Sequence, residues 1–122
     1  AGLEAITGDQ SDTKAMMSEY RRRRDSVVES LNSIEGITCP VPRGSFYAFP
    51  DISAVGLSSQ EFADKLLEEE GVALLPGTDF GANGEGHVRI SFATSQENLN
   101  EGLSRIKRFA LRVGNSRLWD IV

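Results

Sequence analysis

Apolar side chains recur every three or four positions in the first third of the chain, which is the period of an amphipathic helix. Ser11 and Asp12 are candidate N-cap residues for this helix, and Gly36 is its candidate end. The apolar stripe between them consists of Met16, Tyr20, Val27, Leu31 and Ile34. The pattern therefore predicts one long helix, preceded by the end of a shorter helix that closes at Gly8.

Two further helices are predicted by capping boxes, in which Ser or Thr precedes Glu by three residues and the pair satisfies backbone N–H groups at a helix start. Ser58 begins the first box, and the helix after it ends at Gly71. Thr94 begins the second box, and the last helix ends at Gly114. The apolar stripe of this last helix consists of Leu99, Leu103, Ile106 and Ala110.

The segments between the predicted helices have sequence patterns typical of strands. Residues 44–49 are aromatic and follow two prolines, and residues 72–75 are a short apolar run that predicts a buried strand. Residues 76–86 are glycine-rich and predict a loop, after which residues 87–92 alternate between apolar and polar side chains. Three or four strands among these helices predict an α+β fold, a two-layer sandwich of a small sheet covered by helices.

Composition and charge narrow the classes of function. The 122 residues suit one domain, and the single cysteine, Cys39, cannot form an internal disulfide. The net charge of −5 argues against free nucleic acid as a partner. No apolar stretch approaches the roughly 18 residues of a membrane span, so we expect no membrane partner and a reducing, cytoplasmic setting.

Arg89 is the first candidate for chemistry, because it lies in the middle of the alternating strand and points away from the apolar side chains. A guanidinium in this place can hold a carboxylate or a phosphate through two parallel hydrogen bonds. Arg89 can also be a solvated or salt-bridged cation of the sheet. The pattern alone favours this second interpretation because surface cations are ordinary.

The other candidates have simpler interpretations. His87 has no metal-ligand spacing and no nucleophile partner, and Cys39 has no second cysteine, so both are interpreted as structural. The four arginines at 21–24 point around a whole helix and pair with acidic neighbours. The loop 76–86 lacks the Gly-Lys-Ser/Thr end of a phosphate-binding loop. The three lysines, Lys14, Lys65 and Lys107, fall in predicted helices, which is not the setting of a Schiff-base lysine.

Four segments, taken in their order and spacing, resemble the C-terminal small domain of class I/II aminotransferases. These are the pyridoxal-phosphate enzymes of the aspartate aminotransferase type. The segments are residues 20–25, 42–47, 72–80 and 88–94. The resemblance runs from about residue 3 to residue 111, and it implies a small domain over residues 1–114 followed by a tail over residues 115–122.

The resemblance also implies roles for individual residues. Arg89 matches the arginine that binds the α-carboxylate of the amino acid or 2-oxo acid substrate, and Phe46 matches an aromatic residue that lines the substrate cleft. The family's small domain closes over the substrate, while the large domain of the same chain holds pyridoxal 5'-phosphate on a lysine. The motifs for that cofactor are not found in these 122 residues. We therefore expect a part of a longer, homodimeric transferase, inactive without its large domain.

Two other functions stay open on the sequence. The chain can be a stand-alone α+β module that binds small carboxylates through Arg89 without catalysis. It can also belong to a relative of the family with C–S lyase or regulatory function. The residues do not identify the amino acid that would be the substrate.

Overall fold

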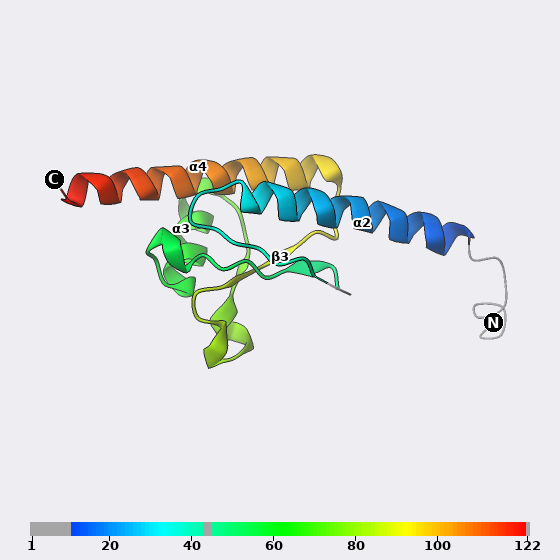
Figure 1. The fold of residues 1–122 in the computed structure, drawn as a ribbon, viewed down its shortest axis with the longest axis horizontal. Coiled ribbons are helices and arrows are strands. Elements are labelled where there is room, and N and C mark those ends of the chain that lie inside the picture. Colours follow the sequence, from blue (N-terminus) through cyan, green and yellow to red (C-terminus); the bar gives the residue numbers. More distant parts are fainter. Residues whose placement is uncertain (1–10, 43–44, 122) are drawn as a thin grey trace.

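The computed structural model describes residues 11–42 and 45–121. Its α-helices are α2 (Ser11–Asn32), α3 (Ser59–Glu70) and α4 (Gln96–Ile121), and its strands are β1 (Tyr47–Ala48), β2 (Leu75–Pro76) and β3 (Val88–Ser91). The strands form one three-stranded sheet in the order β1-β3-β2, with antiparallel neighbours. Helices α2 and α4 lie side by side along one face of the sheet and run in the same direction (Figure 1). The predicted α+β fold is confirmed.

The core lies between the sheet and the helices. Val88, Ile90 and Phe92 are buried, so the alternation predicted for β3 is confirmed. The rings of Phe62 on α3 and Phe109 on α4 meet edge to face beneath the sheet, with centroids 5.2 Å apart. Phe109 was not part of the predicted stripe of the last helix, but all four members of that stripe are buried as expected.

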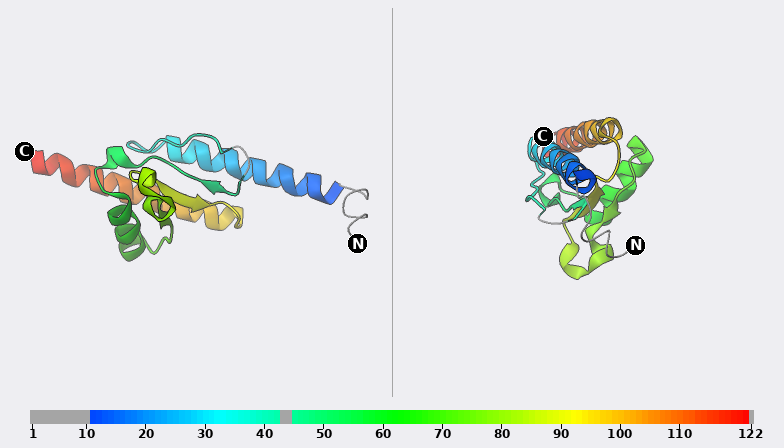
Figure 2. Two further views of the ribbon diagram at one scale, coloured as in Figure 1. Left: turned by 90° about the horizontal axis from the view of Figure 1, so that it is seen from below. Right: turned by 90° about the vertical axis from the view of Figure 1, so that its right-hand side faces the viewer.

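Helix α2 contributes fully buried apolar side chains to the core only from its second half. Val27 and Leu31 are buried, whereas Met16 is 58% exposed and the first turns extend beyond the sheet (Figure 2). The helix ends at Asn32 and not at Gly36, so the predicted end is wrong. The side-chain amide of Asn32 donates to the carbonyl of Cys39 at 2.9 Å, and its oxygen accepts from the Cys39 N–H at 2.8 Å. These two bonds tie the returning chain to the end of the helix.

Both ends of α3 follow their local sequence. The Ser58 hydroxyl accepts a hydrogen bond from the Glu61 N–H at 3.1 Å, and the Glu61 carboxylate accepts one from the Ser58 N–H at 3.2 Å. Gly71 ends the helix in the left-handed region with φ 67°, and its N–H donates to the carbonyl of Leu67. The first capping box and the glycine end are therefore confirmed.

Two predicted strands are shorter or shifted. Residues 72–74 are not strand, because only Leu75 and Pro76 pair with β3, opposite Arg89 and Val88. Val72 and Leu74 are half-buried against the core, so apolar character here reflects packing and not strand pairing. The aromatic segment predicted as a strand over residues 44–49 forms a strand only at β1. Gly44 and the predicted helix end at Gly8 lie outside the described residues.

Helix α4 differs from its prediction at both ends. Its first turn is capped by Ser95 and not by Thr94, because the Ser95 hydroxyl accepts a hydrogen bond from the Asn98 N–H at 3.1 Å. The helix also continues through Gly114 to Ile121, so Gly114 does not end it. A glycine in a helix interior costs only about 1 kcal/mol, so a glycine does not by itself end a helix. The division of the chain at residue 114 into domain and tail stays a prediction.

Candidate functional site

Arg89 lies on β3, the central strand, on the face of the sheet that the helices leave open. Because Val88 and Ile90 point into the core, Arg89 projects the other way and is half-buried. Its guanidinium carbon lies 4.2 Å from the centroid of the Tyr47 ring and 4.4 Å from the centroid of the Phe80 ring. Tyr47 belongs to β1 and Phe80 follows β2, so the two rings approach the cation from the strands on either side.

The N–H groups of Arg89 make no hydrogen bond to the residues that the structure describes. Among residues 11–42 and 45–121, the guanidinium has no hydrogen-bond or ion-pair partner. By contrast, Arg108 and Arg112 on α4 both bind the carboxylate of Glu70, at 2.5 and 3.0 Å. A guanidinium with aromatic rings beside it and its N–H groups free can bind a carboxylate or a phosphate through two parallel hydrogen bonds.

The loop between β2 and β3 carries the Phe80 ring to Arg89. It folds as two short 3-10 turns, η2 (Gly77–Phe80) and η3 (Ala82–Gly84). The backbones of Gly77 and Gly84 pass so closely that a Cβ on Gly77 would lie 2.1 Å from the carbonyl oxygen of Gly84. This contact admits only glycine at both positions. The predicted loop is confirmed, and its glycines allow the close approach that folds it onto itself.

Ser59, the first residue of α3, fixes the end of this loop. Its side chain is fully buried, and its hydroxyl accepts hydrogen bonds from the N–H groups of Gly86 at 2.8 Å and His87 at 3.1 Å. The same hydroxyl lies 3.4 Å from the carbonyl of Gly84, to which it donates. The carboxylate of Glu85 in turn accepts from the Ser59 N–H at 3.1 Å. The start of α3 thus holds the chain immediately before Arg89.

Further aromatic contacts support Phe80 from behind. The Phe49 ring meets Phe80 edge-on at 6.4 Å between centroids. The other contact of Phe49 is with the His87 ring, which is stacked on it at 5.1 Å and 8°. Together with Tyr47 and Arg89, these rings form a continuous row on the open face of the sheet, which we call the aromatic row. The predicted structural interpretation of His87 agrees with this stacked position.

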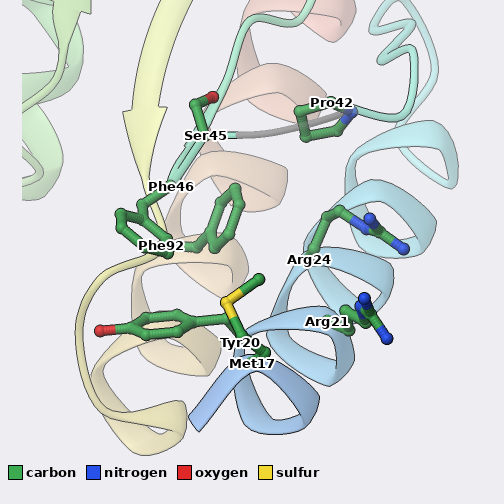
Figure 3. A pocket seen from close by; sticks show the side chains of 8 residues that line it. All are labelled: Met17, Tyr20, Arg21, Arg24, Pro42, Ser45, Phe46 and Phe92. Carbon is green, nitrogen blue, oxygen red and sulfur yellow. The ribbon is translucent and has the colours of Figure 1, made fainter. Parts of the chain in front are cut away.

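Phe46 lies in a different place from Arg89. Its ring is 42% exposed and packs against Tyr20 of α2, with centroids 4.3 Å apart. The two rings line an open hollow of about 190 Å³ between α2 and the chain before β1 (Figure 3). The other residues around this hollow are Met17, Arg21, Arg24, Pro42, Ser45 and Phe92. Arg89 does not line it, so the two predicted site residues do not share a pocket within this chain.

The other sequence candidates have structural settings. Cys39 is buried, and its burial raises the pKa of the thiol, which disfavours a reactive thiolate. Among the arginines of α2, Arg22 and Arg23 pair with Glu19, and Arg24 pairs with Asp25. The predicted acidic pairing of this basic run is therefore confirmed for these three.

Glu70 is the most strongly perturbed acid among the described residues, and no sequence pattern indicated it. It is the last residue of α3 and is buried against α4. Hydrogen bonds from Arg108, and then from Arg112, lower the pKa of its carboxyl to about 2. Arg105 adds a hydrogen bond at 2.9 Å to the carbonyl of Glu70. This cluster joins α3 to α4 and does not include Arg89.

The lysines bear on whether this chain itself holds pyridoxal phosphate. A cofactor bound as a Schiff base needs a lysine amine in a site that also binds the ring and the phosphate. Lys14, Lys65 and Lys107 all lie exposed on helices, and Lys107 borders an open hollow lined by serine, asparagine and apolar side chains. The described residues do not fit this cofactor.

The sequence indicated Arg89 but missed the two rings that flank it. Tyr47 belonged to an expected strand, and Phe80 lay in a loop whose path the residue pattern does not fix. A partial signal for Tyr47 was its place in an expected strand. In the structure Tyr47 pairs with Ser91, which lies two positions from Arg89 on the same face of β3. No comparable signal places Phe80, since its position depends on the fold of the loop.

Comparisons with known proteins agree on one family. A family model described as aminotransferase class I and II matches residues 1–106. The Bacillus subtilis protein YugH is 51% identical over 109 residues, which cover 89% of this chain and 28% of the relative. The aspartate aminotransferase of Pyrococcus horikoshii is 46% identical over 110 residues, or 88% of this chain and 28% of the relative. The chain thus spans little more than a quarter of the length of these relatives.

Solved structures give the same result for the fold. The aspartate aminotransferase from Rhizobium meliloti matches with a TM-score of 0.84 and 36% identity, over 91% of this chain and 30% of that one. The alanine aminotransferase from Pyrococcus furiosus also has a TM-score of 0.84, with 34% identity over 90% of this chain and 28% of that one. Within the described residues, no helix is both long enough and apolar enough to cross a membrane.

Proposed function

Since the chain belongs to the aminotransferase class I and II family, we propose that it is the small domain of a longer, pyridoxal-phosphate-dependent amino-acid aminotransferase. In this proposal the domain supplies Arg89 to bind the α-carboxylate of the amino acid or 2-oxo acid substrate. The homodimeric parent enzyme contributes the large domain. The matched segment makes up only 28% of each of these relatives, which supports a missing partner domain.

The observation that carries the proposal is the setting of Arg89. Its N–H groups have no acceptor among the described residues, and it lies on the open face of the sheet between two rings. A carboxylate that met these N–H groups would form two charge-assisted hydrogen bonds in one plane. Such a pair fixes the direction of the substrate's Cα relative to the reacting group, which is a positioning contribution to the rate.

The chemistry of bond breaking at the substrate Cα belongs to the cofactor, which supplies an electron sink when bound. The described residues do not fit that cofactor, so we place its lysine and its phosphate-binding groups in the part of the enzyme outside this chain. The tasks left for this chain are to bind the carboxylate, to orient the substrate and to exclude water when the domain closes.

Phe46 has a supporting role in the proposal. Its exposed ring stands beside Tyr20 on the part of α2 that extends beyond the sheet. An aromatic surface of this kind can form one wall of a cleft once the large domain is present. Because Arg89 does not line the hollow beside Phe46, we assign Phe46 to the cleft wall and Arg89 alone to the carboxylate.

The proposal is tested in the full-length protein that carries this chain. We expect transamination between amino acids and 2-oxo acids, and we expect Arg89→Ala to raise KM for both substrates while the affinity for pyridoxal phosphate stays unchanged. The 122-residue chain alone should show no activity and, after borohydride reduction with the cofactor, no saturable adduct at a single lysine by mass spectrometry.

Calorimetry separates this proposal from a stand-alone carboxylate-binding module. The isolated chain, titrated with dicarboxylic acids, should give no measurable heat of specific binding because most of the site is absent. Saturable binding that is lost in Arg89→Ala would favour the module. C–S lyase activity without transamination in the full-length protein would favour a family relative with other chemistry.

A further inference from the structure

We infer that Phe80 is a positioning residue for Arg89: its ring, with that of Tyr47, sets the orientation of the guanidinium before the substrate arrives. This inference rests on the proposed role of Arg89 in carboxylate binding. It adds a second residue, and the loop that carries it, to the set that determines substrate affinity.

The contacts around Arg89 support a preset orientation. The two rings lie 4.2 and 4.4 Å from the guanidinium carbon, which is within the range of a favourable cation–π contact. The guanidinium carbon lies over both rings, and no described residue accepts a hydrogen bond from the guanidinium, so its N–H groups remain available to a carboxylate. An arginine has many rotamers, and a side chain that is already ordered loses less freedom when the ligand binds.

Phe80 can set this orientation only if its own place is fixed, and three features fix it. The loop closes on itself where Gly77 and Gly84 meet without side chains between them. Ser59 holds the far end of the loop through three hydrogen bonds. Phe49 supports the Phe80 ring edge-on from the side away from Arg89. Phe80 is therefore the tip of a rigid loop and not a free side chain.

A purely structural role for Phe80 fits the structure less well. Its side chain is 50% exposed and it is not a member of the buried core. A half-exposed ring of this kind adds little to the apolar area that the fold buries. Its ring meets the Phe49 ring and Arg89, so a change at Phe80 should act on substrate affinity before it acts on stability.

The test uses steady-state kinetics of the full-length protein with varied amino-acid and 2-oxo-acid substrates. We expect Phe80→Ala and Phe80→Leu to raise KM by about fivefold, the value of a cation–π contact at a half-exposed site. We expect kcat to change less than twofold, and Phe80→Tyr to restore KM because it keeps the ring. Leu111→Ala is the matched control, since Leu111 is 51% exposed on α4 and does not contact Arg89.

A double-mutant comparison shows whether Phe80 acts through Arg89. In an Arg89→Gln background, which has no cation beside the ring, Phe80→Ala should give no further increase in KM. The inference is overturned if Phe80→Ala matches Leu111→Ala in KM, if it lowers kcat with KM unchanged, or if its effect persists in the Arg89→Gln background. The Arg89→Ala variant tests the proposed function separately from the role of Phe80. An unchanged KM in Arg89→Ala overturns the proposed function itself. A rise in KM on the order of 100-fold supports the proposed function, whatever the effect of Phe80→Ala.

Discussion

Replacement of Ser59 by alanine is expected to destabilise the domain because it leaves one buried N–H donor without its acceptor. The Ser59 hydroxyl is the acceptor for the buried N–H of Gly86 at 2.8 Å, and that N–H has no other acceptor in the part of the chain that the structure describes. The N–H of His87 also bonds to Ser59, but it keeps its 3.0 Å bond to the carbonyl of Gly84. The methyl group of alanine therefore leaves one buried N–H unsatisfied and removes two weaker bonds.

The magnitude follows from these contacts. An unsatisfied buried donor costs about 1–3 kcal/mol, and the weaker bonds add a few tenths, so the free energy of unfolding should fall by roughly 2–3 kcal/mol. For a small domain this moves the midpoint of urea unfolding down by about 1–2 M. Circular dichroism of the 122-residue chain in increasing urea measures that midpoint.

Ser104→Ala is the matched control, because Ser104 is exposed on α4 and its loss should change the free energy of unfolding by less than about 0.5 kcal/mol. If Ser59→Ala unfolds at the same urea concentration as Ser104→Ala, the account of Ser59 as the residue that holds the loop is refuted. A midpoint that falls for both variants alike would also refute it, since the effect would then not depend on burial.

Three further predictions concern the core, the charge cluster and the loop. Phe109→Ala, which removes a fully buried ring that meets Phe62 at 5.2 Å, should lower the free energy of unfolding by about 3–5 kcal/mol in the same urea assay. Hydrogen bonds, chiefly from Arg108, lower the Glu70 pKa from 4.5 to about 2, so their stabilisation is complete above the unfolded value and is lost as the pH falls from 4.5 towards 2. In thermal melts over that pH range Glu70→Gln should lose this part of the pH dependence, and an unaltered profile would contradict the assignment. Gly84→Ala places a methyl group 1.9 Å from the facing carbonyl oxygen and should expose the loop to rapid amide hydrogen exchange, while a wild-type exchange pattern would show that the close contact is not required.

Features that depend on a few neighbouring residues were predictable from the sequence. The cap formed by Ser58 and Glu61 is one example, because both partners lie within one helical turn. The side of β3 on which Arg89 lies is another, because alternation along a strand follows from backbone geometry. The second cap was misplaced by one residue, since both Thr94 and Ser95 can cap a helix and the structure uses Ser95.

Features that depend on distant parts of the chain were not predictable in the same way. The apolar run at 72–75 contacts the core through Val72 and Leu74, and only Leu75 reaches β3, so periodicity could not separate packing from pairing. The place of Phe80 depends on Ser59, which lies about 20 residues earlier and contacts the other end of the loop. The residue pattern thus predicted the candidate arginine but not the rings that flank it.

The central claim is that Arg89 binds the α-carboxylate of the substrate, and one comparison tests it most directly. In the full-length protein, kcat/KM is measured for an amino acid and for the amine that lacks only its carboxylate, with wild-type and Arg89→Ala enzyme. The account predicts that wild-type enzyme prefers the amino acid and that Arg89→Ala loses this preference by a factor on the order of 100. An Arg89→Ala enzyme that keeps the full preference for the amino acid would contradict the account.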